Sequence, residues 1–595
     1  MRLKATVALL VVLALPGSVA TAAASSRHGG PSVATPASPK AAARISTAST
    51  SSTNPIPVPL SDTPPAGRRL SANKVLAIAS ALPKMRAERA KYRGSFGGAY
   101  LKAPLRWQVS FFSHNGKKEI GQVIIDDLSG RVLEQWTGFQ VAWSMARGYP
   151  GAFGRHVNAL YIWLPLCLLF ALPFFNFRRP FSLSNIDLLA LLSFSVSLAF
   201  FNHANIYASV PLTYPPLLYL LVRMLTLLRR TRSHAARRPP PLRLLVPASW
   251  LAVAVVFLLG FRIGLNVTDA NVIDVGYAGV IGAQRITTDR PLYGSYPSDN
   301  ERGDTYGPFN YEAYVPFEQL FGWSGKWDDL PAAHAAAIVF DLLAVGLLFL
   351  LGRRMRGPTL GIALAYAWVS YPFTLYSLES NSNDSLVAVL IIAALLSATY
   401  RSRLAPAARG AFTALAGLTK LAPLALAPLL ATHELVGQRS LRLSRRAGAV
   451  ALFTLAFLAA AALALVPAVT HDSLHTIYER TIAYQANRGS PFSVWGLYGG
   501  LGGLQLAVQI AAVVLALALA LIPRRADLVG LAAACGAVII AVQLGIEHWF
   551  YLYIPWFFPL VIVALLGRFS EHPKRKAAEA STAARSSRPV AALST

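Results

Sequence analysis

A series of long apolar runs limits the possible folds of this chain more than any other feature. We place eleven candidate membrane spans at 159–176, 185–202, 206–228, 242–265, 332–352, 359–377, 384–400, 446–468, 504–523, 526–545 and 548–567. Most of them reach the ~17 to 25 residues that a helix needs to cross a bilayer. Since 54% of the 595 residues are hydrophobic and only 14% are charged, we predict an all-α polytopic membrane protein rather than a soluble enzyme.

The distribution of Lys and Arg predicts the orientation of these spans. The net charge is +28, which on a soluble protein would suggest nucleic-acid binding. Here the cations lie mainly in short connections between apolar runs, and cytoplasmic loops of membrane proteins carry such an excess. We therefore expect no nucleic-acid partner. With the basic loops in the cytoplasm, residues 266–330, 378–383, 469–503 and Glu547 of this plasma-membrane protein lie outside.

The two ends of the chain have the composition of segments that do not fold on their own. Residues 1–24 combine two early cations, an apolar stretch and small residues, which predicts a secretory signal peptide. Residues 25–68 are rich in Ser, Ala, Pro and Thr and predict a disordered linker. Residues 568–595 predict a basic, disordered cytoplasmic tail.

Between the linker and the first span, residues 69–150 have a globular composition. A helical pattern over 71–92 is followed by two strand-like runs at 106–113 and 121–136. This segment resembles the PepSY domain, in which a hairpin strand carries the pattern seen here as Val123, Ile125, Asp126 and Gly130. The resemblance implies a small α+β extracytoplasmic domain with a regulatory rather than a catalytic role.

One apolar segment does not fit the alternation of loops. If 407–432 crossed the membrane once, the arginine-rich loop at 439–446 would lie outside, unlike every other basic loop. Its two short apolar halves meet at Lys420, and the second half contains two prolines. We therefore predict a re-entrant helical hairpin, which places Lys420 deep in the protein, where an ammonium group needs an anionic partner.

The long polar loop at 266–330 contains ten of the 27 acidic residues and many aromatic ones. Such a loop either handles a polar substrate or is simply solvated. Its first acids, Asp269 and Asp274, follow the preceding span closely. Asp274 lies about two turns beyond that span among Val, Ile and Gly, where solvation explains a carboxylate less well. We rank it ahead of Asp269 as a functional acid; for either one, the alternative is a helix-capping or solvated residue.

The region 242–567 resembles the GT-C membrane glycosyltransferases. The features that carry the resemblance are the acidic first loop, Leu292-Tyr293-Gly294, Tyr306-Gly307-Pro308, Asn381-Ser382-Asn383-Asp384, Lys420 followed by Pro423, and Arg488-x-Ser490-Pro491 in a late loop. The resemblance implies an inverting transfer of a sugar, mannose or arabinose, from a polyprenyl-phosphate donor to an extracytoplasmic glycan or glycolipid of the cell envelope. Paired signatures such as D-x-D are absent from the start of the loop, so we expect a single carboxylate as base and no metal or other cofactor.

Inverting transfer from a lipid phosphate needs a carboxylate to accept the acceptor's proton and donors to stabilise the leaving phosphate. Lys420 and Arg488 are the leading cations, each of which has an ordinary alternative as a boundary or loop residue. The remaining substrate-binding candidates are polar or aromatic residues at predicted span mouths and in the external loops: Tyr293, Tyr306, Asn381, Asp384 and His548. For His548, aromatic packing is the stronger alternative.

Two other functional classes compete with this hypothesis. A transporter of an anionic or lipid-linked substrate would also use a re-entrant hairpin with a buried lysine, but the spans show no internal repeat. A sensor in which the spans only anchor the N-terminal domain would not need eleven of them. The chain has three spans in 155–241 in addition to the glycosyltransferase-like region, and its two cysteines, Cys167 and Cys535, both lie in apolar runs.

Overall fold

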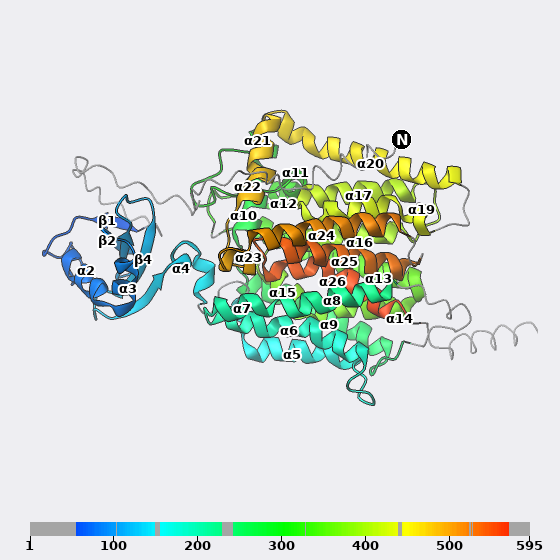
Figure 1. Cartoon of the computed structure of the whole chain (residues 1–595), viewed down its shortest axis with the longest axis horizontal. Coiled ribbons are helices and arrows are strands. Elements are labelled where there is room, and N and C mark those ends of the chain that lie inside the picture. Colours follow the sequence, from blue (N-terminus) through cyan, green and yellow to red (C-terminus); the bar gives the residue numbers. More distant parts are fainter. Residues whose placement is uncertain are drawn as a thin grey trace, which may run out of the picture. The chain divides into compact units, whose positions relative to one another are not determined.

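The computed structural model describes residues 55–102, 104–148, 155–228, 242–327, 329–437, 443–522, 525 and 527–569. The predicted signal peptide, most of the linker and nearly all of the basic tail therefore lie outside the described residues. The chain divides into a small N-terminal part, which ends before residue 150 and also takes in Phe200–Ile206, and a helical part formed by the rest (Figure 1).

The N-terminal part is a five-stranded antiparallel sheet with two longer helices and, after the last strand, the short α4 (Phe139–Ala142). The strands are β1 (Ile56–Val58), β2 (Phe96–Lys102), β3 (Arg106–Phe112), β4 (Glu119–Asp126) and β5 (Val132–Thr137), in that spatial order, and the longer helices are α2 (Ala72–Ala81) and α3 (Pro83–Ala90). Helix residues such as Val75, Ala79 and Met85 bury against Trp107, Val109 and Phe111 of β3. The predicted α+β character of this part is confirmed.

Three details of this part differ from the prediction. The predicted single helix is two helices, because Pro83 cannot continue α2 and begins α3 instead. Strand β2 is missing from the prediction, since its two glycines lower its strand propensity; a Cβ at Gly97 would lie 2.5 Å from Leu76 of α2, so the close approach of the helix favours glycine there. Finally, Ile56–Val58 lies within the predicted linker but pairs with β2 as an edge strand.

The helical part contains the following main helices: α5 (Leu160–Ala171), α6 (Leu183–Asn202), α7 (Ile206–Leu212), α8 (Tyr214–Leu227), α9 (Ala248–Asp269), α13 (Pro331–Arg356), α14 (Pro358–Ser370), α15 (Pro372–Glu379), α16 (Asp384–Ser397), α17 (Ala405–Thr419), α20 (Leu443–Val469), α24 (Gly502–Leu521), α25 (Leu528–Gly545) and α26 (Ile554–Leu566). Among the described residues, seven helices or helix pairs are long and apolar enough to cross a membrane. The other four predicted spans coincide with shorter apolar helices, and their crossing remains a prediction.

Two of the short apolar helices, α16 and α26, lie at the centre of the bundle. Every residue of α16 is buried, as is every residue of α26, whereas the apolar windows of α9, α20 and α24 are only 17% buried. A helix that is apolar on all sides is buried by its neighbours. In Figure 1, α16, α25 and α26 accordingly lie among the other helices, and α20 lies at the edge of the bundle.

The segment 405–434, which includes the predicted hairpin at 407–432, folds back on itself; that it enters the membrane from one side only stays a prediction. Helix α17 ends where Lys420 adopts extended backbone, and the chain returns through a 3₁₀ turn (Ala422–Leu426) and α18 (Ala427–Ala431). Arg409, near the start of α17, donates to the carbonyl of Leu430 at 2.9 Å and forms an ion pair with Glu434. The two ends of the segment therefore lie side by side, and Lys420 is at its tip.

The polar loops gather at one end of the helical part. Short helices α10 (Asp274–Thr287), α11 (Pro308–Glu312), α12 (Val315–Phe321), α21 (Leu474–Tyr478), α22 (Tyr484–Asn487) and α23 (Val494–Leu497) cover this end. Figure 1 shows α10, α21, α22 and α23 close to one another there. We call this the loop end; the basic connections, such as Arg353–Arg356, belong to the opposite end of the helices.

Candidate active site

The site begins with Asp274, the first residue of α10. The start of this helix rests directly on the turn that precedes α16, because a Cβ on Gly276 would lie 2.2 Å from the carbonyl oxygen of Asn381. The Asn300 amide donates to the backbone carbonyl of Asp274 at 2.9 Å. These two contacts hold the backbone at Asp274 and do not involve its carboxylate oxygens.

The Asp274 carboxylate is solvent-accessible although protein surrounds it closely. Desolvation by this protein raises its pKa, while the nearby charges of Arg488 and Lys420 and the amide of Val275 lower it. A carboxylate that is partly desolvated and faces cations can accept a proton from a substrate hydroxyl. Of the two acids singled out in the sequence, Asp274 is the one near both candidate cations.

Lys420 has its anionic partner within the protein. Its ammonium group lies 2.5 Å from the carboxylate of Asp384, and both side chains are almost completely buried. The indole of Trp556 donates to the same carboxylate oxygen at 2.8 Å. The sequence predicts that buried Lys420 needs an anionic partner, and the structure identifies this partner as Asp384. The buried charge of Lys420 is therefore compensated without a substrate phosphate.

Aromatic rings enclose the Lys420 ammonium group. Its nitrogen lies 5.7 Å from the ring centre of Tyr306, 5.4 Å from that of Tyr553 and 5.1 Å from that of Trp556. Tyr553 and Trp556 stack on each other at 4.2 Å. Cation–π contacts of this kind favour a charged ammonium in a desolvated site. Tyr306 thus belongs to the site, and it is partly accessible.

The loop before α26 contributes His548, which pairs with Ser490. The imidazole Nδ1 lies 2.8 Å from the Ser490 hydroxyl, and the ring packs against Phe492 and Tyr553. Burial, Arg488 and Lys420 together hold the pKa of His548 well below its usual value. The lowered pKa favours the neutral imidazole, which shares a hydrogen bond with Ser490.

Three of the residues singled out in the sequence form hydrogen bonds with groups other than Asp274. Asp269 accepts hydrogen bonds from the backbone and ring of His156 at 3.0 and 2.6 Å. Tyr293 is buried and donates to the Tyr306 carbonyl at 3.0 Å, so it stabilises the backbone at Tyr306. Asn381 is fully buried in left-handed backbone, with φ of 47°, and bonds Asn266 and Asn271. None of these three presents its polar atoms to Asp274.

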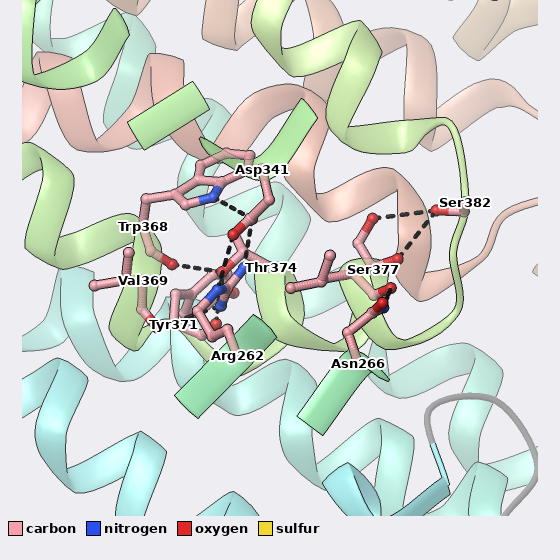
Figure 2. Close-up of polar contacts among 10 residues, drawn as sticks. Arg262, Asn266, Asp341, Trp368, Val369, Tyr371, Thr374, Ser377 and Ser382 are labelled. Carbon is pink, nitrogen blue, oxygen red and sulfur yellow. Dashed lines mark hydrogen bonds and ion pairs between the residues drawn. The ribbon is translucent and has the colours of Figure 1, made fainter. Parts of the chain in front are cut away.

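A buried polar network supports the turn before α16. Arg262 donates to both carboxylate oxygens of Asp341, and Trp368 donates to one of them at 2.8 Å. Figure 2 shows this cluster beside Asn266, one turn further along α9, whose amide donates to the carbonyl of Leu378. Breaking a buried ion pair typically costs about 3–5 kcal/mol, so this network holds α9, α13 and α15 together.

Four residues of the site and its support were not singled out in the sequence: Arg262, Asp341, Tyr553 and Trp556. A signal for the first two was present, because each is a charge well inside a predicted span and such charges face protein and pair. For Tyr553 and Trp556 there was no such signal, since aromatic residues are common at membrane boundaries. Among the described residues, no group of three or more His, Cys, Asp or Glu side chains is arranged to hold a metal ion.

Residues 305–544 match the model of Glycosyltransferase family 87, a family of GT-C type. The matched region includes Tyr306, Asp384, Lys420 and Arg488, and it confirms the predicted resemblance of the membrane part to GT-C glycosyltransferases. It leaves out Asp274 and the N-terminal part, whose resemblance to PepSY stays a prediction.

Among solved structures, the chain is similar to ArnT from Cupriavidus metallidurans, crystallised with undecaprenyl phosphate. The identity is 20%, the TM-score is 0.36, and the match covers 57% of this chain and 64%, less than two thirds, of that one. No curated protein matches the sequence.

Proposed function

We propose that this protein is an inverting glycosyltransferase that moves a sugar from a polyprenyl-phosphate donor to a glycan or glycolipid at the outer face of the plasma membrane. The observation that supports the proposal is the proximity of Asp274 to Arg488 and Lys420, whose charges lower the pKa of its carboxyl, together with the match of residues 305–544 to Glycosyltransferase family 87. The polyprenyl-phosphate donor is the one that the resemblance of the sequence to GT-C transferases implies.

In this mechanism the Asp274 carboxylate takes the proton from the acceptor hydroxyl. At the same time, the hydroxyl oxygen attacks the anomeric carbon of the donor sugar. The bond from that carbon to the phosphate oxygen breaks, and polyprenyl phosphate leaves with the electron pair. Cations near the developing phosphate charge stabilise this step. Because Asp384 already compensates Lys420, Arg488 is the leading candidate for contact with the phosphate, and Lys420 chiefly shapes the site through the rings of Tyr306 and Trp556.

We infer the orientation of the protein in the membrane from the positions of its basic connections. With the basic connections in the cytoplasm, the loop end and Asp274 lie outside, where a lipid-linked sugar and an envelope glycan meet. Mannose and arabinose are the donor sugars that we propose to test first. No metal takes part in the proposed step, so a chelator should leave the rate unchanged.

The first prediction tests the base directly. Full-length protein in lipid nanodiscs is supplied with undecaprenyl-phosphate mannose or arabinose, and sugar transfer is followed by mass spectrometry. Asp274→Asn should lower kcat by about 10²- to 10⁴-fold, the usual contribution of a general base, because the volume is kept and only the proton acceptor is lost.

Asp269→Asn is the matched control, since Asp269 is held by His156, and its kcat should stay near that of the wild type. If Asp269→Asn loses transfer and Asp274→Asn keeps it, the base is Asp269. If both variants transfer at the normal rate, the mechanism with a single carboxylate is wrong.

A further inference from the structure

A recess at the loop end lies beside the candidate active site and plays no part in the proposed donor chemistry. It has a volume of about 310 Å³ and is lined by side chains of the loop before α11 and of the segment Glu479–Asn487, among them Arg302, Thr305, Arg480 and Tyr484. This volume is at the lower end of the about 300 to 1,000 Å³ typical of small-molecule sites.

The recess and the active site share their walls. Thr305 lines the recess, and the next residue, Tyr306, lies over Lys420. On the opposite wall, the Tyr484 ring has the Arg302 guanidinium 5.4 Å from its centre and the Arg488 guanidinium 6.0 Å from it. Since Arg488 also acts on Asp274, the Tyr484 ring connects the recess to the candidate catalytic groups.

The walls of the recess are held in place by buried contacts. Arg480 reaches the fully buried carboxylate of Asp304 at 3.4 Å, and the same carboxylate accepts the amide of Gly294 at 2.6 Å. The Gln485 amide reaches the Thr305 carbonyl at 3.5 Å. Glu479–Ala483 forms a π-helical turn, a local widening that is frequent at functional sites. The recess therefore needs little ordering to bind a ligand.

Charges of both signs surround the recess, from Arg302, Arg480, Arg488, Glu479 and Asp304. Asp304 offsets Arg480, and the carboxylate of Glu479 lines the recess together with Arg302, so a free anion would meet a like charge there. Guanidinium, carboxylate, amide and hydroxyl groups around one tyrosine ring instead suit a sugar, which offers many hydroxyls and an apolar ring face.

From this arrangement we infer that the recess is the acceptor subsite and that it binds a neutral glycosyl unit of the acceptor, stacked on Tyr484 with its hydroxyls toward Arg302 and Asn487. The inference rests on the proposed glycosyltransferase function. It assigns the acceptor to the Arg302 side of Tyr484 and the donor phosphate to the groups around Arg488, Lys420 and Tyr306.

The test uses full-length protein in nanodiscs, with undecaprenyl-phosphate mannose or arabinose as donor and octyl α-mannoside or octyl α-arabinoside as acceptor probes. Tyr484→Ala should raise the KM for the acceptor probe about fivefold or more, as expected for the loss of an aromatic contact, and leave the KM for the donor unchanged. Tyr484→Phe keeps the ring and should behave like the wild type. Tyr478→Ala, which removes an exposed tyrosine of α21, is the control.

The Tyr484 ring also contacts Arg488. A second variant therefore tests only the wall that the loop before α11 forms. Arg302→Gln should raise the acceptor KM and not the donor KM, whereas Arg290→Gln, at an exposed position outside the recess, should change neither. An unchanged acceptor KM in both Tyr484→Ala and Arg302→Gln overturns the inference while the transferase function stands. A larger effect on the donor KM than on the acceptor KM overturns it as well.

A binding measurement keeps the two proposals separable. Saturation-transfer NMR should detect the sugar protons of the octyl glycosides on the wild type and lose them on Tyr484→Ala. If the wild type transfers no sugar but still shows this difference, the proposed reaction fails and the sugar site remains. If inorganic phosphate competes with the glycoside for the recess, the site takes an anion and the inference is wrong.

Discussion

At the scale of single residues, the buried pair of Lys420 and Asp384 determines how a lysine variant can be interpreted. Lys420→Met leaves the Asp384 carboxylate buried without its cation, and such a loss typically costs about 3–5 kcal/mol. The variant should therefore unfold at a clearly lower temperature than the wild type, in addition to any loss of transfer.

The double variant Lys420→Met with Asp384→Asn separates the two effects. It removes both charges, and the indole of Trp556, which donates to Asp384 in the wild type, can still donate to the amide oxygen of the substituted side chain, so most of the lost thermal stability should return. A transfer rate that returns with it would show that the Lys420 charge is not needed for donor use. A rate that stays low in a stable double variant would assign Lys420 a direct role at the donor.

A half-buried carboxylate, Glu312 on α11, predicts a pH-dependent stability. Desolvation raises its pKa from 4.5 to about 7. The folded state therefore binds a proton that the unfolded state loses, and stability falls as pH rises through this window. Glu312→Gln should raise the melting temperature at pH 8 and change it little at pH 5.

For comparison, Glu301→Gln, at an exposed position of the same loop, should have the same melting temperature as the wild type at both pH values. Equal effects of Glu312→Gln at pH 5 and pH 8 would contradict the raised pKa. Scanning calorimetry or dye-based unfolding in nanodiscs provides the measurement.

At the scale of helices, the position of α10 on the turn before α16 sets where the base is. A methyl group at Gly276 would meet the Asn381 carbonyl at 2.2 Å, and backbone at that distance must shift. Gly276→Ala should thus displace Asp274 and lower kcat by about 10-fold or more, since small displacements of catalytic groups have effects up to about 10²-fold.

Gly264→Ala is the matched control, because the Cβ at this glycine of α9 meets nothing within 4 Å. It should keep the transfer rate and gain slightly in stability, as Ala does in an unhindered helix. A normal rate in Gly276→Ala would show that α10 does not need its present position for catalysis.

The helices were more predictable from the sequence than their pairing. The length of the apolar runs located the helices. The interruption of the run 407–432 at Lys420 and the basic loop after it predicted the hairpin. Both kinds of signal are local in the sequence. The partners of Lys420 and Arg262 lie 36 and 79 residues away. A single sequence does not reveal which helix faces which, so Asp384 was assigned to the substrate rather than to Lys420, and Asp341 was not singled out.

At the scale of the whole molecule, the hairpin determines the side on which every later loop lies. Because Arg409 contacts Leu430 and Glu434, the segment returns to the end where it began. Arg446, which follows it, donates to the Leu435 carbonyl at that end. If 405–434 crossed the membrane instead, α20 and all later helices would be reversed relative to the GT-C arrangement that we propose.

Cysteine labelling of intact cells tests this arrangement in the last prediction. With Cys167 and Cys535 replaced by Ser, a membrane-impermeant maleimide should label Ser298→Cys and Gly499→Cys, which are exposed at the loop end, and should not label Ser444→Cys, which is exposed after the hairpin. Permeabilised cells supply the control, since all three cysteines should then react. Labelling of Ser444→Cys in intact cells would place the start of α20 outside. The hairpin would then be a crossing segment, and the residues at Arg488 and His548 would lie on the opposite side of the membrane from Asp274, which the site does not allow.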